Sequence, residues 1–291
     1  MKVEKIYPHG FCWGVKSAVD KALTALAELP PPVYCLHELV HNSIVVAELK
    51  RRGMVFVESL EEVPRGSSTM FSAHGVSPAV REEARSRNLR VIDATCPFVD
   101  RAHRRLAGFA GGGTPVVIVG HAAHAEVHGL IGEVCGGAYR VIDCADDVAS
   151  LPFPPESKVG VVCQTTLSGG EVDAIMSALR ARYRFLETSA AADVCTATRD
   201  RQAAVRAFVL GGGDAVLVLG SRSSSNTCRL AEIAKAAGAR VFMAEAAEDV
   251  AACDFAEVER LGVTAGASTP ENFFNAAVRM IAGRLNAETT D

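Results

Sequence analysis

One cysteine-containing segment occurs three times in this chain, and this repetition limits the possible folds more than any other feature. In each copy a short apolar strand pattern precedes a cysteine, and apolar residues at helical spacing follow it. The cysteines are Cys12, Cys96 and Cys195. In the second copy Pro97 follows directly, and proline is favoured in the first turn of a helix. Each cysteine is therefore predicted on a strand-to-helix turn, where the helix dipole favours a thiolate.

The order of elements after each cysteine also repeats. At a nearly constant distance comes an apolar strand with a polar cluster at its end, then an acidic segment, then another strand that ends in a polar loop. The three polar clusters contain His37 and His41, His121 and His124, and residues 223–226. Strands rich in Val, Ile and Leu that alternate with helices are typical of parallel βαβ units. The sequence therefore predicts an α/β protein with three pseudo-repeated lobes.

The lobe boundaries are predicted at the cysteines. The first lobe comprises residues 13–95, the second 96–194 and the third 195–269. Residues 1–12, which contain the first strand, and the C-terminal helix over residues 270–285 are expected to complete the first lobe.

The composition is that of an ordinary globular protein, with 49% hydrophobic and 22% charged residues among 291. The net charge of −4 provides no basic field, which argues against nucleic-acid binding as the main activity. No apolar run approaches the roughly 18 residues of a membrane helix, and no signal peptide is recognisable, so we expect a cytoplasmic protein without a membrane partner. Nine scattered cysteines without CxxC pairs favour reduced thiols and metal ligation over a disulfide framework.

Ligands of parallel α/β sheets bind at the carboxyl ends of the strands. If three lobes face one axis, the three cysteines and six polar loops meet in a central chamber. Thiolates suit iron or zinc, and three protein ligands leave a fourth metal position for substrate. The sharpest interpretation of Cys12, Cys96 and Cys195 is an iron–sulfur cluster with one iron not bound by cysteine. The other six cysteines are interpreted as core or connecting residues, and structural roles are favoured for His9 and His103.

Two polar clusters allow further interpretations. His121, His124 and His128 have the spacing of a local zinc site, although no carboxylate or cysteine completes an obvious ligand set. Glu126 would be a surface charge by default, except that its loop is predicted to face the chamber. Serine and asparagine at 223–226 are either simple loop residues or an anion site at a helix N-terminus.

The chain resembles the 4-hydroxy-3-methylbut-2-enyl diphosphate reductase family from about residue 9 to residue 271. Eight motifs in the same order carry the resemblance: Gly10-Phe-Cys-Trp-Gly-Val15, His37-Glu-Leu-Val-His-Asn42, Phe71-Ser-Ala-His-Gly-Val76, Asp93-Ala-Thr-Cys-Pro97, Gly120-His-Ala-Ala-His-Ala-Glu126, Gln164-Thr-Thr-Leu-Ser168, Ser223-Ser-Ser-Asn226 and Thr264-Ala-Gly-Ala-Ser268.

The resemblance implies a three-lobed α/β protein around a central 4Fe–4S cluster held by Cys12, Cys96 and Cys195. The open iron would take the hydroxyl oxygen of the substrate, an allylic diphosphate. The implied reaction is the last step of the non-mevalonate isoprenoid pathway, in which an allylic alcohol is reduced to isopentenyl and dimethylallyl diphosphates with loss of water. A ferredoxin or flavodoxin would donate the electrons.

The resemblance also assigns the remaining site residues. Thr165 and Glu126 would serve the substrate hydroxyl and its protonation. The diphosphate site would be lined by His41, His74, His124, Ser224, Ser225, Asn226 and Ser268. Three positions depart from the family pattern: Trp13 replaces a small residue, His9 replaces an arginine, and His128 stands where an acidic residue is common.

Two other classes of protein share parts of this pattern. Quinolinate synthase also has three pseudo-repeated lobes with one cluster cysteine in each, but the histidine motifs and Asp93-Ala-Thr-Cys-Pro97 favour the reductase. A non-enzymatic α/β protein that binds a metal or a nucleotide would use strand-end loops but would not need a carboxylate beside an open iron. A brown colour after anaerobic purification would exclude a protein without a cluster.

The repetition of the three cysteines leads to a first prediction. Replacing Cys12, Cys96 or Cys195 singly by serine is expected to abolish or cripple cluster assembly, because each supplies one thiolate. Replacing Cys35 or Cys163, which lie inside apolar strands, is expected to leave the iron and sulfide content unchanged. Full iron and sulfide in the Cys96→Ser protein would refute the assignment.

Overall fold

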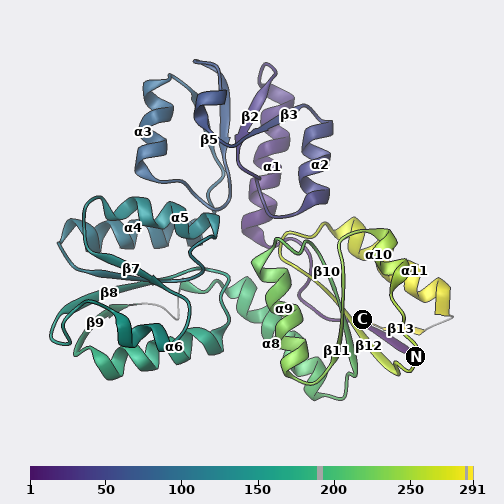
Figure 1. Cartoon of the computed structure of the whole chain (residues 1–291). Helices are drawn as coiled ribbons and strands as arrows, with labels where there is room; N and C mark the ends of the chain where they lie inside the picture. Colours follow the sequence, from purple (N-terminus) through teal and green to yellow (C-terminus); the bar gives the residue numbers. More distant parts are fainter. Residues whose placement is uncertain (189–192, 286–287, 291) are drawn as a thin grey trace. The chain divides into compact units, whose positions relative to one another are not determined.

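Three parallel β-sheets organise the chain, as Figure 1 shows for the computed structural model. The structure describes residues 1–188, 193–285 and 288–290. Every pair of neighbouring strands within these sheets is parallel, and helices connect the strands. The predicted α/β class with three repeated lobes is confirmed.

The first lobe contains a four-stranded sheet in the order β3-β2-β4-β5. The chain enters this sheet at β2, continues to the edge strand β3, and then crosses over to β4 on the other side of β2. The elements are α1 (Trp13–Glu28), β2 (Val33–Leu36), α2 (Ser43–Arg51), β3 (Met54–Val57), a short 3-10 helix η1 (Leu60–Glu62), β4 (Ser68–Phe71), α3 (Pro78–Ser86) and β5 (Arg90–Asp93).

The second lobe repeats this arrangement with the strand order β7-β6-β8-β9. Its elements are α4 (Pro97–Gly111), β6 (Val116–Val119), α5 (Ala125–Ile131), η2 (Gly132–Val134), β7 (Tyr139–Ile142), η3 (Asp146–Ser150), β8 (Lys158–Cys163), α6 (Gly169–Arg182) and β9 (Phe185–Thr188). The matching strand orders explain why the polar clusters recur at matching places in the sequence.

The third sheet has five strands in the order β11-β10-β12-β1-β13. The elements contributed by the C-terminal third of the chain are α8 (Thr196–Leu210), β10 (Ala215–Leu219), α9 (Ser225–Ala236), β11 (Arg240–Ala244), α10 (Ala247–Ala252), β12 (Arg260–Ala265), α11 (Glu271–Leu285) and β13 (Glu288–Thr290). The fourth position, which β5 and β9 occupy in the other sheets, is taken by β1 (Lys2–Lys5).

The prediction that residues 1–12 and 270–285 complete the first lobe is therefore wrong. β1 pairs with β12 along its whole length, with Val3 opposite Leu261. In α11, Phe274 and Ile281 pack in the same hydrophobic cluster as Val3, with both side chains at most 1% exposed. The physical reason is that the strand before each cysteine closes the preceding sheet, so the strand before Cys12 closes the last one.

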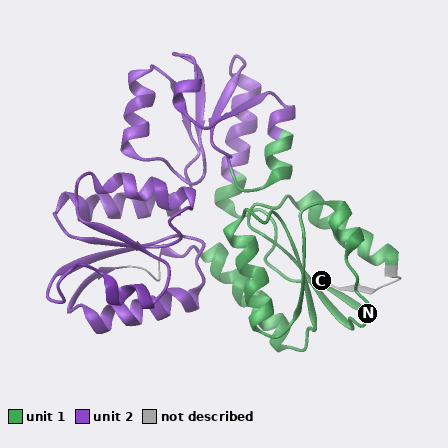
Figure 2. Ribbon diagram, viewed as in Figure 1, with its two compact units in different colours: residues 1–16, 40–48, 196–291 green, residues 17–39, 49–195 purple. Residues whose placement is uncertain are grey.

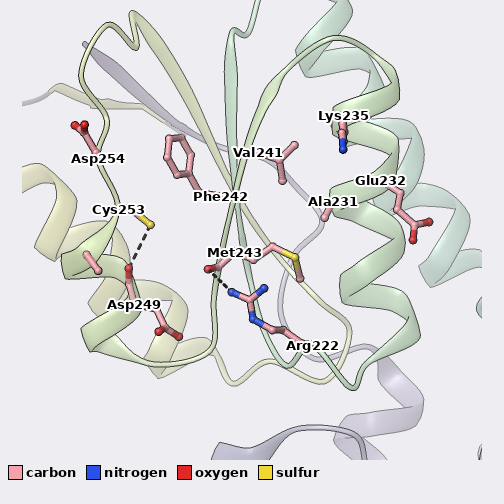
Figure 3. Close-up of a pocket in the computed structure, with 11 residues that line it drawn as sticks. Arg222, Ala231, Glu232, Lys235, Val241, Phe242, Met243, Asp249, Cys253 and Asp254 are labelled. Carbon is pink, nitrogen blue, oxygen red and sulfur yellow. Dashed lines mark hydrogen bonds between the residues drawn. The ribbon is translucent and has the colours of Figure 1, made fainter.

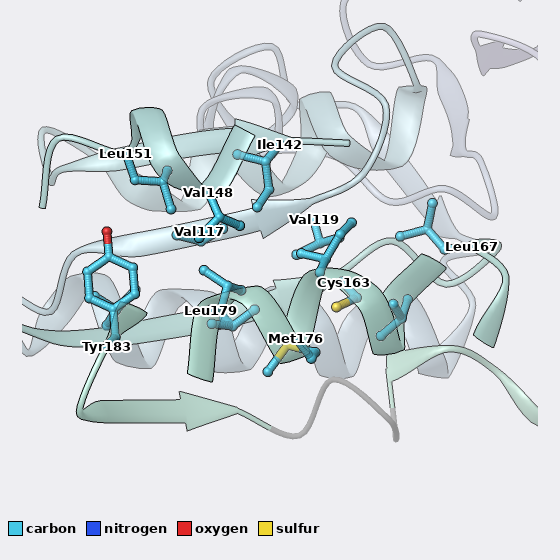
Figure 4. Packing of buried hydrophobic residues seen from close by; sticks show 14 of the residues in the cluster. Val117, Val119, Ile142, Val148, Leu151, Cys163, Leu167, Met176, Leu179 and Tyr183 are labelled. Atoms are coloured by element: carbon cyan, nitrogen blue, oxygen red, sulfur yellow. The ribbon is translucent and has the colours of Figure 1, made fainter. Parts of the chain in front are cut away.

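Both faces of the second sheet are buried, as expected for parallel strands covered by helices. Alternate residues of β6 point to opposite faces: Val117 and Val119 join one cluster, whereas Val116 and Ile118 join another. Figure 4 shows the first cluster, in which side chains of α6 such as Leu179 lie against the sheet.

The repeated acidic segments are helix caps. Glu62 accepts the backbone N–H groups of Glu58 and Ser59 at 2.9 and 3.0 Å. In the third lobe Asp249 accepts the N–H groups of Glu245 and Ala246 at 2.8 and 3.1 Å. The equivalent residue of the second lobe, Asp147, accepts the N–H of Asp143 at 3.2 Å. These carboxylates satisfy N–H groups that a short helix leaves unpaired at its start.

The chain divides into two compact units (Figure 2). One unit, formed by residues 1–16, 40–48 and 196–291, contains the third sheet. The other, formed by residues 17–39 and 49–195, contains the first and second sheets. No helix in the described part of the chain is both long and apolar enough to cross a membrane.

Candidate functional site

Each of the three predicted cluster cysteines lies between the fourth strand of a sheet and a long helix. Cys12 follows β1 and precedes α1, Cys96 follows β5 and precedes α4, and Cys195 follows β9 and precedes α8. Cys96 is the N-cap residue of α4, with Pro97 as the first helical residue. For Cys12 and Cys96 the predicted turn between a strand and a helix is confirmed. For Cys195 the position directly before a helix is confirmed, whereas residues 189–192 of its turn lie outside the described residues.

One backbone hydrogen bond anchors each cysteine in the same way. The cysteine N–H donates to a carbonyl oxygen in the loop that follows the third strand of the sheet, namely β12, β4 or β8. The bonds are Cys12 to Ala267 at 3.0 Å, Cys96 to Ala73 at 3.0 Å and Cys195 to Thr165 at 3.2 Å. These loops contain Ser268, His74 and Thr165, which are predicted substrate residues. Each predicted metal ligand is thus tied to a predicted substrate-binding loop.

The thiols fit the donor set that an iron–sulfur cluster requires. None of these three cysteines belongs to a disulfide, and all three are partly exposed. The Sγ atom of Cys12 accepts the N–H of Val15 at 3.4 Å, a contact that stabilises negative charge on sulfur. By contrast, burial raises the pKa of Cys35 to about 12 and raises that of Cys163 further above its ordinary value. These two thiols remain protonated core side chains, in agreement with their interpretation from the sequence.

Glu126 and Thr165 form a buried polar pair in the second lobe. The backbone N–H and the hydroxyl of Thr165 each donate to the Glu126 carboxyl at 2.9 Å. Glu126 is 1% exposed, and burial raises its pKa from 4.5 to about 7, although the bonds from Thr165 oppose this shift. A carboxyl group with this pKa is partly protonated at neutral pH and can act as a general acid.

His124 lies beside this pair, and the His74 ring lies near the His124 ring in the same unit. Their rings are 6.0 Å apart between centroids and are oriented edge to face. His124 is the N-cap of α5, and its Nδ1 accepts the N–H of Glu126 at 3.2 Å. Because Nδ1 accepts, the proton of a neutral ring is carried by Nε2, which makes Nε2 a hydrogen-bond donor. Nδ1 of His74 lies 3.4 Å from the Ser72 hydroxyl.

The residues Ser224, Ser225 and Asn226 form the start of α9 in the other unit. Ser224 is the N-cap, and its hydroxyl accepts the N–H of Thr227 at 3.4 Å. Asn226 is 4% exposed, and its Oδ1 accepts the N–H of Ala267 at 3.0 Å. Its Nδ2 is buried and has no hydrogen-bond partner. A buried amide donor without a partner is unfavourable in the protein alone and is consistent with a ligand oxygen as its acceptor.

His41 and Ser268 belong to the same unit as these residues. The Ser268 hydroxyl donates to the backbone oxygen of His41 at 2.9 Å. The next residue, Asn42, accepts the N–H of Val45 through Oδ1 at 3.2 Å and so caps α2. The polar cluster of each lobe therefore lies at the start of a helix, where backbone N–H groups favour anions.

The local zinc site considered for the second lobe is not formed. His128 is exposed, His124 caps its helix, and Nδ1 of His121 lies 4.0 Å from a carboxylate oxygen of Asp143. Among the described residues, the three potential metal ligands close to one another are Asp143, Cys144 and Asp147, which belong to an exposed capping turn.

His9, His103 and Trp13 were also singled out in the sequence, and the structure gives the contacts or the exposure of each. The His9 ring is buried and stacks on Phe274 at 3.6 Å between centroids, and burial lowers its pKa. His103, also buried, pairs with Glu133 at 2.8 Å. Both histidines have the structural roles that the sequence favours. Trp13, next to Cys12, is 67% exposed.

An open groove of about 640 Å³ lies elsewhere on the third lobe, beside the edge strand β11 (Figure 3). It is lined by side chains of both charges, among them Arg222, Lys235 and Glu232, and contains none of the predicted site residues. We assign it no role.

Two residues near the site were missed from the sequence. Asp193 is buried and accepts hydrogen bonds from Arg105 and from the N–H of Cys163. The feature of the sequence that could have pointed to Asp193 is its position as an acidic residue two residues before Cys195. Gln164, which is 0% exposed, accepts the N–H of His121 through Oε1 at 3.0 Å and was noted only as part of a motif.

The raised pKa of Glu126 predicts a pH effect on stability. Between pH 4.5 and about 7 the folded protein holds a proton on this carboxyl that the unfolded chain releases. The free energy of unfolding therefore falls as the pH rises through this window, by on the order of 3 kcal/mol. Anaerobic denaturant unfolding of the wild-type and Glu126→Gln proteins at several pH values measures the effect. Parallel pH profiles of the two proteins would contradict it.

Comparisons with known proteins agree with the resemblance. The family model described as "LytB protein" matches residues 3–282. The chain is 43% identical to 4-hydroxy-3-methylbut-2-enyl diphosphate reductase 2 of Burkholderia mallei, covering 93% of this chain and 82% of that protein. It is 40% identical to the reductase of Pseudomonas putida, covering 100% and 94%. The solved structure of the E-1-hydroxy-2-methyl-but-2-enyl-4-diphosphate reductase of Plasmodium falciparum superposes with a TM-score of 0.94 at 32% identity, covering 99% and 91% of the two chains. This chain belongs to the LytB protein family.

Proposed function

We propose that this protein is a 4-hydroxy-3-methylbut-2-enyl diphosphate reductase. One observation carries the proposal beyond family membership. The buried acid Glu126 is bound by Thr165, and the carbonyl of Thr165 in turn binds the N–H of Cys195. A proton donor and a predicted cluster ligand are thus joined through one residue.

The reaction replaces the hydroxyl of an allylic alcohol by hydrogen. The C–O bond breaks, two electrons and two protons are consumed, and an alkene and water are formed. Cys12, Cys96 and Cys195 would hold a 4Fe–4S cluster, which would relay electrons from an external donor and provide a Lewis-acidic iron. The protein must supply the protons and hold the diphosphate.

Glu126 is suited to deliver a proton because its carboxyl is partly protonated near pH 7. The two bonds from Thr165 fix its orientation, and the Thr165 hydroxyl is able to relay a proton between the carboxyl and the substrate oxygen. The burial of both side chains keeps bulk water away from the carboxyl.

The diphosphate is held by neutral donors and helix N-termini. The buried Nδ2 of Asn226, which has no hydrogen-bond partner in the protein, and the start of α9 provide donors for anionic oxygens. Nε2 of His124, a donor when the ring is neutral, belongs to the proposed set of diphosphate ligands. Five further residues complete the proposed set: His41, His74, Ser224, Ser225 and Ser268.

The decisive experiment is anaerobic turnover of the allylic diphosphate with a reduced viologen dye. We expect the wild-type protein to form both isopentenyl and dimethylallyl diphosphates. The Glu126→Gln protein is expected to keep its cluster and bind substrate but to lose roughly 10²–10⁴-fold in turnover, the usual contribution of a general acid. Near wild-type turnover in a cluster-replete Glu126→Gln protein would remove Glu126 from the mechanism. No product from the cluster-replete wild type would refute the proposed function.

Substrate binding is expected not to require Mg²⁺. Arg222, which directly precedes the Ser/Asn cluster, pairs with Glu245 at 3.6 Å between Nε and Oε1, so the diphosphate is expected to rely on histidine, hydroxyl, amide and backbone donors. Calorimetric titration with the diphosphate is expected to give the same affinity with Mg²⁺ and with EDTA. A strict requirement for Mg²⁺ would contradict this proposal.

We also propose that the electrons come from a ferredoxin or flavodoxin and that the protein works in the cytoplasm. The electron donor is proposed because the reaction consumes two electrons that the cluster must receive from another protein. For the location, the described residues contain no helix that could span a membrane.

A further inference from the structure

The helix that follows one predicted cluster cysteine carries a basic side chain, and this side chain binds the chain segment that precedes another cluster cysteine. α4 begins after Cys96 and contains Arg105. Nη1 of Arg105 donates to Oδ1 of Asp193, which lies just before Cys195. A single ion pair thus connects the helix of one predicted cluster ligand with the chain segment of the next.

Asp193 joins three parts of the second lobe. Its side chain is 1% exposed, and its second oxygen, Oδ2, accepts the N–H of Cys163 at the end of β8 at 3.1 Å. The loop after β8 continues to Thr165, whose carbonyl binds the N–H of Cys195. The Cys195 segment is therefore held by one backbone bond at the cysteine itself and by two bonds at Asp193.

The same arrangement recurs at the other cysteines. α8, which begins after Cys195, carries the buried Arg201, and its Nη2 donates to the carbonyl of Gly10 at 2.8 Å. Gly10 lies just before Cys12 and has a positive φ of 70°. On α1, the exposed Lys21 donates to the carbonyl of Asp93, just before Cys96, at 2.8 Å. The acceptor is a carboxylate in the second lobe and a backbone carbonyl in the other two, but each contact joins the helix after one cysteine to the segment before another.

A buried ion pair is a poor source of stability, because desolvation of both charges offsets their attraction. It does fix geometry, since guanidinium and carboxylate bind only in a narrow range of orientations. Residues that orient metal ligands from behind typically affect metal retention strongly. We propose that Arg105, acting through Asp193, is a positioning residue that holds Cys195 for the iron–sulfur cluster. This inference rests on the proposed cluster site.

The test measures how fast the protein loses its cluster. Wild-type, Asp193→Asn and Arg105→Lys proteins are purified anaerobically, and the loss of visible absorbance in the presence of an iron chelator is followed. The amide introduced by Asp193→Asn would keep an acceptor for the Cys163 N–H but lose the charge, so we expect this variant to lose the cluster roughly 10–100-fold faster. Arg105→Lys keeps the charge but loses the planar fork and is expected to fall between Asp193→Asn and wild type.

A matched control separates positioning from general stability. Tyr183→Phe removes a buried hydrogen bond to the Phe153 carbonyl, 3.2 Å long, which lies in the same lobe and involves neither Asp193 nor a cysteine. It is expected to lower the melting temperature while leaving the rate of cluster loss and the electron paramagnetic resonance spectrum of the reduced cluster unchanged. Asp193→Asn is expected to change both.

The outcomes distinguish this inference from the proposed function. Two outcomes would overturn the positioning role alone. One is loss of the cluster at the wild-type rate in both Asp193→Asn and Arg105→Lys. The other is loss of the cluster in Tyr183→Phe as fast as in Asp193→Asn when the two variants have similar melting temperatures. If Asp193→Asn does not fold, the rate for Arg105→Lys decides. A wild-type protein that binds no iron would refute the proposed function and this inference together.

Discussion

The hydrogen bond from each cysteine N–H to a strand-end carbonyl is the interaction on which the candidate site depends. It occurs three times, at Cys12, Cys96 and Cys195, with lengths from 3.0 to 3.2 Å. The bond joins the strand-to-helix turn that carries a thiol to the loop that carries a polar side chain. Because both partners are backbone groups, the connection does not depend on which side chain the loop carries. Histidine, threonine and serine can therefore occupy equivalent places in the three lobes.

Two buried carboxyl groups of the second lobe show how their surroundings determine their roles. Among the described residues Glu126 accepts hydrogen bonds from the neutral donors of Thr165, with no cation in direct contact, so burial dominates and raises its pKa to about 7. Burial also raises the pKa of Asp193, but this carboxyl faces the guanidinium of Arg105, which opposes the shift and compensates a negative charge. The first group is suited to exchange protons, and the second is suited to hold a chain segment in place.

The three repeats are connected in a cyclic manner. The strand before each cysteine closes the preceding sheet, so β5 belongs with the first lobe, β9 with the second and β1 with the third. The N-terminal strand is consequently held by pairing with β12, far away in the sequence. The hydrogen bonds donated by the basic side chains follow the same cyclic order. Each joins the helix that follows one cysteine to the segment that precedes the next cysteine, and the donors are Lys21, Arg105 and Arg201.

The sequence by itself determined the α/β class, the threefold repeat and the turns that carry the cysteines, because periodicity, proline and strand-end polar residues are local signals. It also pointed to Glu126 and Thr165 through motifs. Only the tertiary structure decided that β1 and α11 belong to the third sheet, since the pairing of Val3 with Leu261 leaves no local signal. The pKa of Glu126 and the Arg105–Asp193 pair were likewise beyond the sequence, because both depend on burial and on contacts between residues distant in the chain.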